Sequence, residues 1–129
     1  MSRKHFQTKH DAGWTRHARL GTPEPDVNVG AVLSRGVQIT VRPERFRDVL
    51  ARQIRQDIWR KLAAVRGLLP IVTVTGGPGT GSPLKVEAGA VLTGKCPASA
   101  YVRSVLEQVL NDPILRRRWL QHAEQASRC

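Results

Sequence analysis

The segment from Arg42 to Gly67 constrains the fold most, because it carries a long helical pattern of apolar residues. Pro43 suits the first turn of a helix and Gly67 suits its C-terminal stop. Apolar side chains recur between them at steps of four and three, the spacing that aligns them on one helix face: Phe46, Leu50, Ile54, Ile58, Leu62 and Val65. The segment therefore predicts one long amphipathic helix.

The basic residues of this helix fall opposite or beside the apolar face: Arg45, Arg47, Arg52, Arg55, Arg60 and Lys61. The spacing predicts ion pairs from Asp48 to Arg52 and from Asp57 to Lys61, each worth roughly 0.2–0.5 kcal/mol. Burial of one large apolar side chain contributes more, ~1.5–3 kcal/mol. We therefore expect packing to hold the helix and leave its arginines available for a partner.

Charge is the strongest compositional signal, since the 129 residues carry a net charge of +11 and a pI of about 11.2. Residues 1–66 hold 14 Lys and Arg against 6 Asp and Glu, whereas residues 67–129 hold 7 against 4. Basic domains favour nucleic acid, because neutralising phosphates releases counterions and supplies affinity without a sequence code. The composition predicts an anionic partner, either DNA or RNA.

Length and composition favour a single soluble domain of the cytoplasm with no membrane partner. No apolar run approaches the ~20 residues that span a bilayer, and the opening does not resemble a signal peptide. The two cysteines, Cys96 and Cys129, form neither a closely spaced metal pair nor a disulfide framework, which fits a reducing compartment.

Residues 1–26 predict a basic, poorly structured arm that ends in a Pro-containing linker, because neither a helical nor a strand period survives a count. Basic residues are mixed there with Phe6 and Trp14, a composition that can follow a phosphate backbone while its rings stack on bases. The alternative is a solvated tail whose Trp14 packs against the body.

Residues 27–129 predict one α+β domain with two β-hairpins around the central helix, in the order ββαββαα. Alternating apolar residues in 27–33 and 37–41 predict the first hairpin, and 71–75 with 84–93 predict the second. Apolar spacing predicts helices over 98–110 and 114–125, with Asn111-Asp112-Pro113 ending the first and capping the second.

The loop from Gly76 to Pro83 resembles the phosphate-binding loop of P-loop nucleotidases, whose pattern is G-x-x-x-x-G-K-[ST]. Gly76 and Gly81 have the required spacing. Ser82 replaces the lysine and Pro83 replaces the Mg-binding residue, so nucleotide hydrolysis is not expected. A hairpin tip is the favoured reading, with a backbone cradle for a single phosphate as the alternative.

No catalytic or metal constellation is evident, so the protein is predicted to be no enzyme and to use no cofactor. The spacing of His5, His10 and His17 matches no standard zinc pattern. His122 reads as a surface residue, and no nucleophile is accompanied by a histidine and a carboxylate.

The two C-terminal helices read as a packing hairpin with an exposed basic edge, although Arg116-Arg117-Arg118 also invites a helix-turn-helix interpretation. Three consecutive arginines spread around a helix, so they suit backbone phosphates better than base edges.

The sequence predicts a small non-enzymatic nucleic-acid-binding protein that contacts mainly the phosphate backbone. The alternative is an accessory, regulatory or inhibitory protein that docks on an acidic surface of a larger nucleoprotein complex. The candidate nucleic-acid-binding residues are Arg3, Lys4, Lys9, Trp14, Arg16, Arg19, Arg45, Arg52, Arg55, Arg60, Arg116, Arg117 and Arg118.

Overall fold

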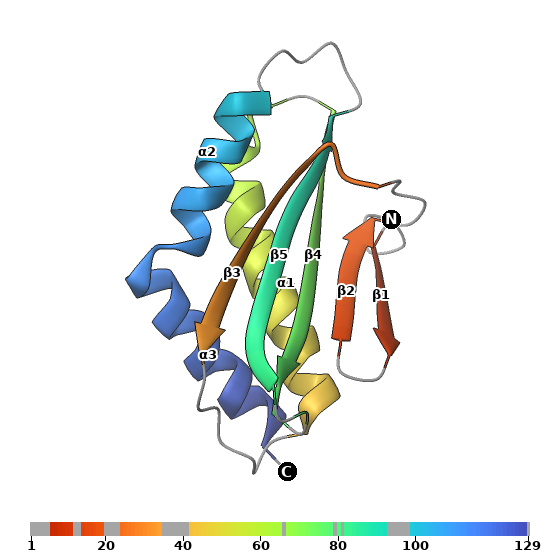
Figure 1. Cartoon of the computed structure of the whole chain (residues 1–129), viewed down its shortest axis with the longest axis vertical. Helices are drawn as coiled ribbons and strands as arrows, with labels where there is room; N and C mark the ends of the chain where they lie inside the picture. The colour runs from red at the N-terminus through yellow and green to blue at the C-terminus, as the bar shows by residue number, and fades with distance from the viewer. Residues whose placement is uncertain are drawn as a thin grey trace.

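An antiparallel sheet with three helices packed on one of its faces forms the computed structural model of the protein (Figure 1). The structure describes residues 6–11, 14–19, 24–34, 42–65, 67–78, 80, 82–92 and 99–128, with the backbone alone at 6–11, 14, 17, 19 and 34. Cys96, Cys129 and the predicted strand 37–41 lie outside these ranges.

The strands are β1 (Phe6–Asp11), β2 (Trp14–Arg19), β3 (Val27–Ser34), β4 (Leu68–Gly77) and β5 (Ser82–Leu92). The helices are α1 (Pro43–Leu62), α2 (Ser99–Leu110) and α3 (Pro113–Ser127). The strand order is β1-β2-β4-β5-β3, and every neighbouring pair is antiparallel. The predicted α+β class, with strands before and after the central helix and two helices at the end, is confirmed.

Helix α1 follows its predicted apolar pattern closely. Phe46, Leu50, Ile54, Ile58 and Leu62 are at most 1% exposed and pack into the main core. Pro43 opens the helix, and Gly67 adopts a φ of 75°, a conformation that favours glycine and follows the helix end. The helix therefore lies across the sheet with its predicted face inward.

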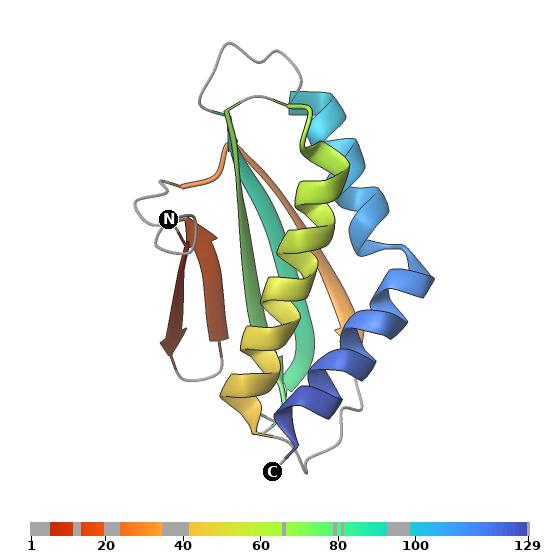
Figure 2. The same ribbon diagram turned by 180° about the vertical axis from the view of Figure 1, so that it is seen from behind.

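The two faces of the sheet differ because the helices cover only one of them (Figures 1 and 2). On the covered face, Val72, Val74, Val86 and Ala88 are fully buried beneath the helices. The alternate residues on the open face form a small apolar cluster of Ala18, Leu69, Ile71 and Val91 next to polar side chains. The main core therefore lies between the sheet and the helices.

The N-terminal arm is more structured than predicted, since residues 6–19 form the hairpin of β1 and β2 at one edge of the sheet. β2 pairs with β4 from Trp14 opposite Thr75 to Ala18 opposite Ile71. This pairing uses the backbone, and Thr15 and Ala18 of β2 are buried against the rest of the sheet. Such a strand leaves no long apolar alternation in the sequence.

Of the first predicted hairpin, the structure describes the first strand and not the second, 37–41. β3 has the predicted strand at 27–33, and it pairs with β5.

The glycine-rich loop is a hairpin tip, as predicted. β4 continues through Gly76 and Gly77, whose φ angles are 77° and 84°. A Cβ at Gly76 would lie 2.2 Å from the carbonyl oxygen of Pro83, so only glycine fits there. The tip leads into β5 rather than into the helix that a P-loop requires.

Helices α2 and α3 have the predicted extents within a few residues, and the Asp112 side chain caps α3 by accepting from the backbone N–H groups of Ile114 and Leu115. Their arrangement differs from the prediction. α3 begins where α2 ends and turns away from it, and each helix contacts α1, so the two do not fold back on each other as a hairpin (Figure 2). The short joint was compatible with both arrangements.

The division of α1 into an apolar and a basic face makes a stability prediction. Ile54→Ala should lower the free energy of unfolding by ~2–5 kcal/mol, because it leaves a cavity in the core. Arg52→Ala on the same helix should change it by less than about 1 kcal/mol, because its ion pair is exposed. Chemical denaturation of both variants measures the difference, and equal losses would contradict the assignment of the faces.

Candidate nucleic-acid interface

The outer side of α1 carries two of the predicted arginines on one ridge. Asp48 holds both of them: its carboxylate lies 3.7 Å from Nη1 of Arg45 and 2.9 Å from Nε of Arg52. The arginine side chains remain 49% and 53% exposed, whereas that of Asp48 is 13% exposed. The shared carboxylate therefore orders two solvent-facing guanidinium groups.

Trp59 extends this ridge toward the C-terminal end of α1. It follows Arg52 by seven residues, as Arg52 follows Arg45, so the three lie along one side of the helix with steps of about 10.5 Å. Trp59 is 46% exposed, which is uncommon for so large an aromatic side chain. We call Arg45, Asp48, Arg52 and Trp59 the α1 ridge.

Two other arginines of α1 are much less accessible. Arg47 is 3% exposed, and burial lowers the pKa of its guanidinium, while the nearby Glu44 raises it. Arg55 is half-buried, and both burial and the charge of Arg52 lower its pKa. Arginine nonetheless stays charged at neutral pH. Of these two, only Arg55 was predicted to bind phosphate, and it lies at the margin of the α1 ridge.

Arg60 and Arg118 meet at a carboxylate between α1 and α3. Asp57 accepts hydrogen bonds from Nη1 of Arg60 at 3.3 Å, from Nη2 of Arg118, and from Nε1 of the buried Trp119 at 2.6 Å. The predicted pairing of Asp57 with Lys61 is wrong, because Asp57 faces α3. Both arginines remain at least 50% exposed, so they can still contact a partner at their outer edges.

Arg116 makes hydrogen bonds within the fold. Its guanidinium donates to the carbonyl oxygens of Leu110 and Val32 and to the side-chain oxygen of Asn111. With Arg103, which donates to the carbonyl oxygen of Asn28 at 3.4 Å, it covers backbone acceptors on the outer edge of β3. Arg117 beside it is exposed. This use of Arg116 does not suit a recognition helix, whose N-terminal polar residues contact base edges.

The structure separates the predicted arm residues from the α1 ridge. Arg16 lies on the open face of the sheet, opposite the face that α1 covers. The backbones of Lys9, Trp14 and Arg19 belong to the β1–β2 hairpin, where Lys9 pairs with Arg16. Arg3 and Lys4 lie outside the described residues, so their predicted role stays a prediction.

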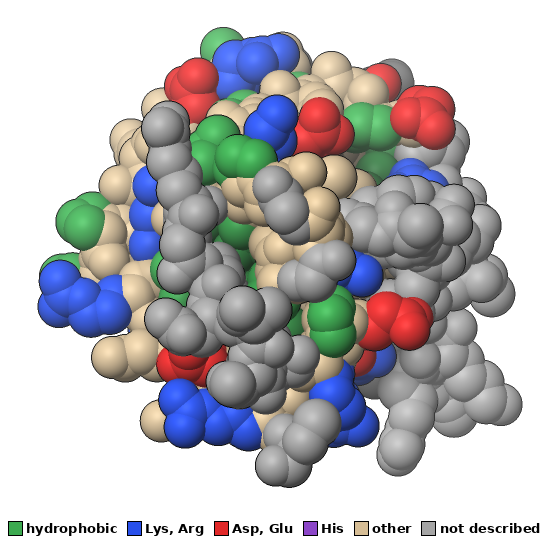
Figure 3. Space-filling model, turned by 60° about the horizontal axis from the view of Figure 1, so that its bottom comes forward, with side chains coloured by type: hydrophobic (Ala, Val, Ile, Leu, Met, Phe, Trp, Pro, Cys, Tyr) green, Lys and Arg blue, Asp and Glu red, His purple; other side chains and the backbone are tan. Residues whose placement is uncertain are grey.

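The Lys and Arg side chains do not form a single continuous patch on the face shown in Figure 3. Figure 3 shows Lys and Arg side chains at several separate places, interspersed with Asp, Glu and apolar side chains. Helix α1 itself carries six Lys and Arg against three Asp and Glu. Helix α1 therefore carries a net positive charge of its own.

Trp59 is not among the candidate residues predicted from the sequence. Its spacing from Arg45 and Arg52 at multiples of seven was the available signal. The roles of Arg116 and Arg118 had no comparable signal, because their partners Val32 and Asp57 are 84 and 61 positions away.

Within the described part of the chain, no three His, Cys, Asp or Glu side chains are grouped so that they could hold a metal ion. His122 is exposed. No helix among the described residues is long and apolar enough to span a membrane. The chain matches no protein-family model, and neither a curated protein nor a solved structure is significantly similar to it.

The Asp57 contacts predict unequal effects for two aspartates that each bind two arginines. Asp57→Ala should destabilise the fold by ~1–3 kcal/mol, because it leaves the buried Nε1 of Trp119 without its acceptor. Asp48→Ala should cost less than about 1 kcal/mol, because its partners are exposed. Thermal and chemical denaturation of the two variants compare them, and a larger loss at Asp48 would contradict this assignment.

Two adjacent arginines of α3 should also differ. Arg116→Ala should lower the free energy of unfolding by roughly 0.5–1.5 kcal/mol, since it uncovers acceptors at the end of α2 and the edge of β3. Arg117→Ala should change it by less than about 0.5 kcal/mol, as is usual for exposed positions. The same denaturation measurement decides, and an equal effect at both positions would argue against a structural role of Arg116.

Proposed function

We propose that the protein binds nucleic acid, mainly through the phosphate backbone, with the α1 ridge as the primary contact surface. The observation that supports this most is the arrangement of Arg45 and Arg52 around Asp48, with the exposed Trp59 further along the same side. Arginine guanidinium groups bind phosphates in a fork geometry, and an exposed indole ring can stack on an unpaired base.

The secondary contacts of this proposal come from the arginines beside the ridge. Arg60, Arg117 and Arg118 are exposed on the helix layer, and Arg55 lies at the margin of the ridge. These arginines are spread over the outer surface of α1 and α3. They are not gathered at one helix end, as they would be in a helix that reads bases in a DNA groove. The proposed binding therefore depends on charge and varies little with base sequence.

The N-terminal hairpin affects how this proposal is tested. β2 pairs with β4 along five residues, so removing residues 1–20 would leave an inner strand of the sheet unpaired. A loss of binding in such a truncation would not separate lost contacts from a damaged fold. Charge-removing point substitutions on α1 are the better test.

Titrations of single-stranded and duplex oligonucleotides at several salt concentrations measure the expected binding. Affinity should be micromolar or better at low salt, and it should fall by orders of magnitude between about 50 and 200 mM salt if roughly 6–10 phosphates are contacted. Arg45→Gln with Arg52→Gln should reduce the salt slope by up to about two units, and Trp59→Ala should weaken single-strand binding by ~1–3 kcal/mol.

Lys85→Gln is the control, because Lys85 is exposed on the open face of the sheet, opposite the helix layer that carries the ridge. It should leave affinity and slope within error of the unmodified protein. If a folded sample binds no oligonucleotide at 50 mM salt, the proposal is wrong and an acidic protein becomes the expected partner. If the control and the ridge variants lose affinity equally, the charge acts without a defined surface.

A further inference from the structure

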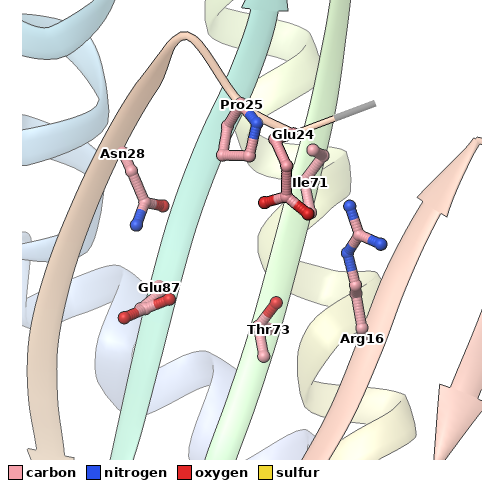
Figure 4. A pocket seen from close by; sticks show the side chains of 7 residues that line it. All are labelled: Arg16, Glu24, Pro25, Asn28, Ile71, Thr73 and Glu87. Atoms are coloured by element: carbon pink, nitrogen blue, oxygen red, sulfur yellow. The ribbon is translucent and has the colours of Figure 1, made fainter. Parts of the chain in front are cut away.

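A cavity of about 320 Å³ lies on the open face of the sheet, away from the α1 ridge (Figure 4). Its floor is formed by Ile71 and Thr73 of β4, between Arg16 of β2 and Glu87 of β5. Asn28 of β3 and the segment of Glu24 and Pro25 complete the lining. The cavity thus combines charged, polar and apolar groups from four strands and the segment before β3.

The segment above the cavity is held against the sheet by two hydrogen bonds of Asp26. Its backbone N–H donates to the carbonyl oxygen of Ala90 at 2.9 Å, and its carboxylate accepts from the N–H of Leu92 at 2.8 Å. Gly89 allows this close approach, because a Cβ there would lie 2.9 Å from Cβ of Pro25 and 3.0 Å from Oδ1 of Asn28. The segment of Glu24 and Pro25 is therefore held in a fixed position beside the cavity.

Opposite charges face this cavity without neutralising each other. Arg16 and Glu87 lie in one row across the sheet, with Thr73 between them, so their Cα atoms are about 10 Å apart at the usual strand spacing. Among the described residues, no ion pair joins Arg16 to Glu87 or to Glu24. Figure 4 shows the guanidinium of Arg16 and the carboxylate of Glu24 on either side of the open space.

The row that contains Arg16 and Glu87 ends at Gly30 of β3, which pairs with Glu87. A Cβ at Gly30 would meet only the carbonyl oxygen of Val86 at 3.8 Å and Cγ of Glu87 at 3.9 Å. A Cβ would therefore fit at this position in ordinary van der Waals contact. Its absence leaves space next to the carboxylate of Glu87.

We propose that this cavity binds a small molecule with one carboxylate and two cationic nitrogens, the charge pattern of a free basic amino acid such as lysine or arginine. Its carboxylate pairs with the guanidinium of Arg16, and its two cationic groups pair with Glu24 and Glu87. Its aliphatic stem packs on Ile71 and Pro25. This charge pattern complements one arginine and two glutamates, and the proposal goes beyond nucleic-acid binding.

Isothermal titration calorimetry of the full chain at low salt tests the charge pattern. L-Lysine or L-arginine should bind saturably. Cadaverine, which lacks the carboxylate, and norleucine, which lacks the side-chain amine, should each bind roughly tenfold more weakly or worse than lysine. No saturable binding of either basic amino acid at millimolar concentration, or equal binding of lysine and norleucine, would overturn the proposal.

Substitutions in the lining assign each charge to its partner. Glu87→Gln should weaken lysine and cadaverine alike by roughly tenfold, whereas Arg16→Gln should weaken lysine by a similar factor and leave cadaverine unchanged. Lys85→Gln is the control, because Lys85 is exposed on the same face of β5 but does not line the cavity. Equal affinity in Arg16→Gln, Glu87→Gln and Lys85→Gln would place the ligand elsewhere.

Gly30→Val provides a test by volume instead of charge. Valine suits a strand, so the variant should keep its melting temperature while its side chain occupies the space beside Glu87. Lysine affinity should fall by at least tenfold. Unchanged affinity in this folded variant would contradict a contact between the ligand and Glu87.

Discussion

The contact between Asp57 and Trp119 ties the helix layer together. The two residues are 62 positions apart, and the carboxylate of Asp57 is the acceptor of the only polar hydrogen in the indole ring of Trp119, which is fully buried. A buried N–H without an acceptor costs ~1–3 kcal/mol, so this geometry strongly favours one placement of α3 against α1. Because α1 covers the centre of the sheet, the main core also depends on that placement.

Arginine side chains also connect the helices to the edge of the sheet. Arg103 and Arg116 donate to backbone carbonyl groups on the outer edge of β3, where a strand would otherwise present unpaired acceptors. At the opposite side, the β1–β2 hairpin covers the edge of β4 by direct pairing. The two sides of the sheet are thus protected by different means, one by side chains and one by additional strands.

The α1 helix could be predicted because its signal is local: five inward residues from Phe46 to Leu62 repeat at helical spacing, and Gly67 marks the end. The β1–β2 hairpin could not, because polar residues alternate with few apolar ones there and the pairing is made through the backbone. The sequence also could not predict which arginines make contacts within the fold and which remain exposed. Arg116 and Arg117 are adjacent in sequence, yet only the position of β3 distinguishes their surroundings.

Some of the basic residues therefore act inside the molecule, and the net charge of +11 overstates the surface that a partner can use. Arg47 is buried and Arg116 is engaged by backbone carbonyl groups, whereas Arg45 and Arg52 are exposed and ordered by Asp48. This distribution favours the outer side of α1 for a polyanion.

The open face of the sheet has a different chemistry. The carboxylates of Glu24 and Glu87 at the cavity would repel a phosphate backbone, although Arg16 lies beside them. A polyanion on that face would bring its charges toward two carboxylates, whereas a small ligand with both signs of charge would meet complementary groups. The sheet separates this cavity from the α1 ridge, so the two proposed binding surfaces lie on opposite sides of the sheet and can be tested independently.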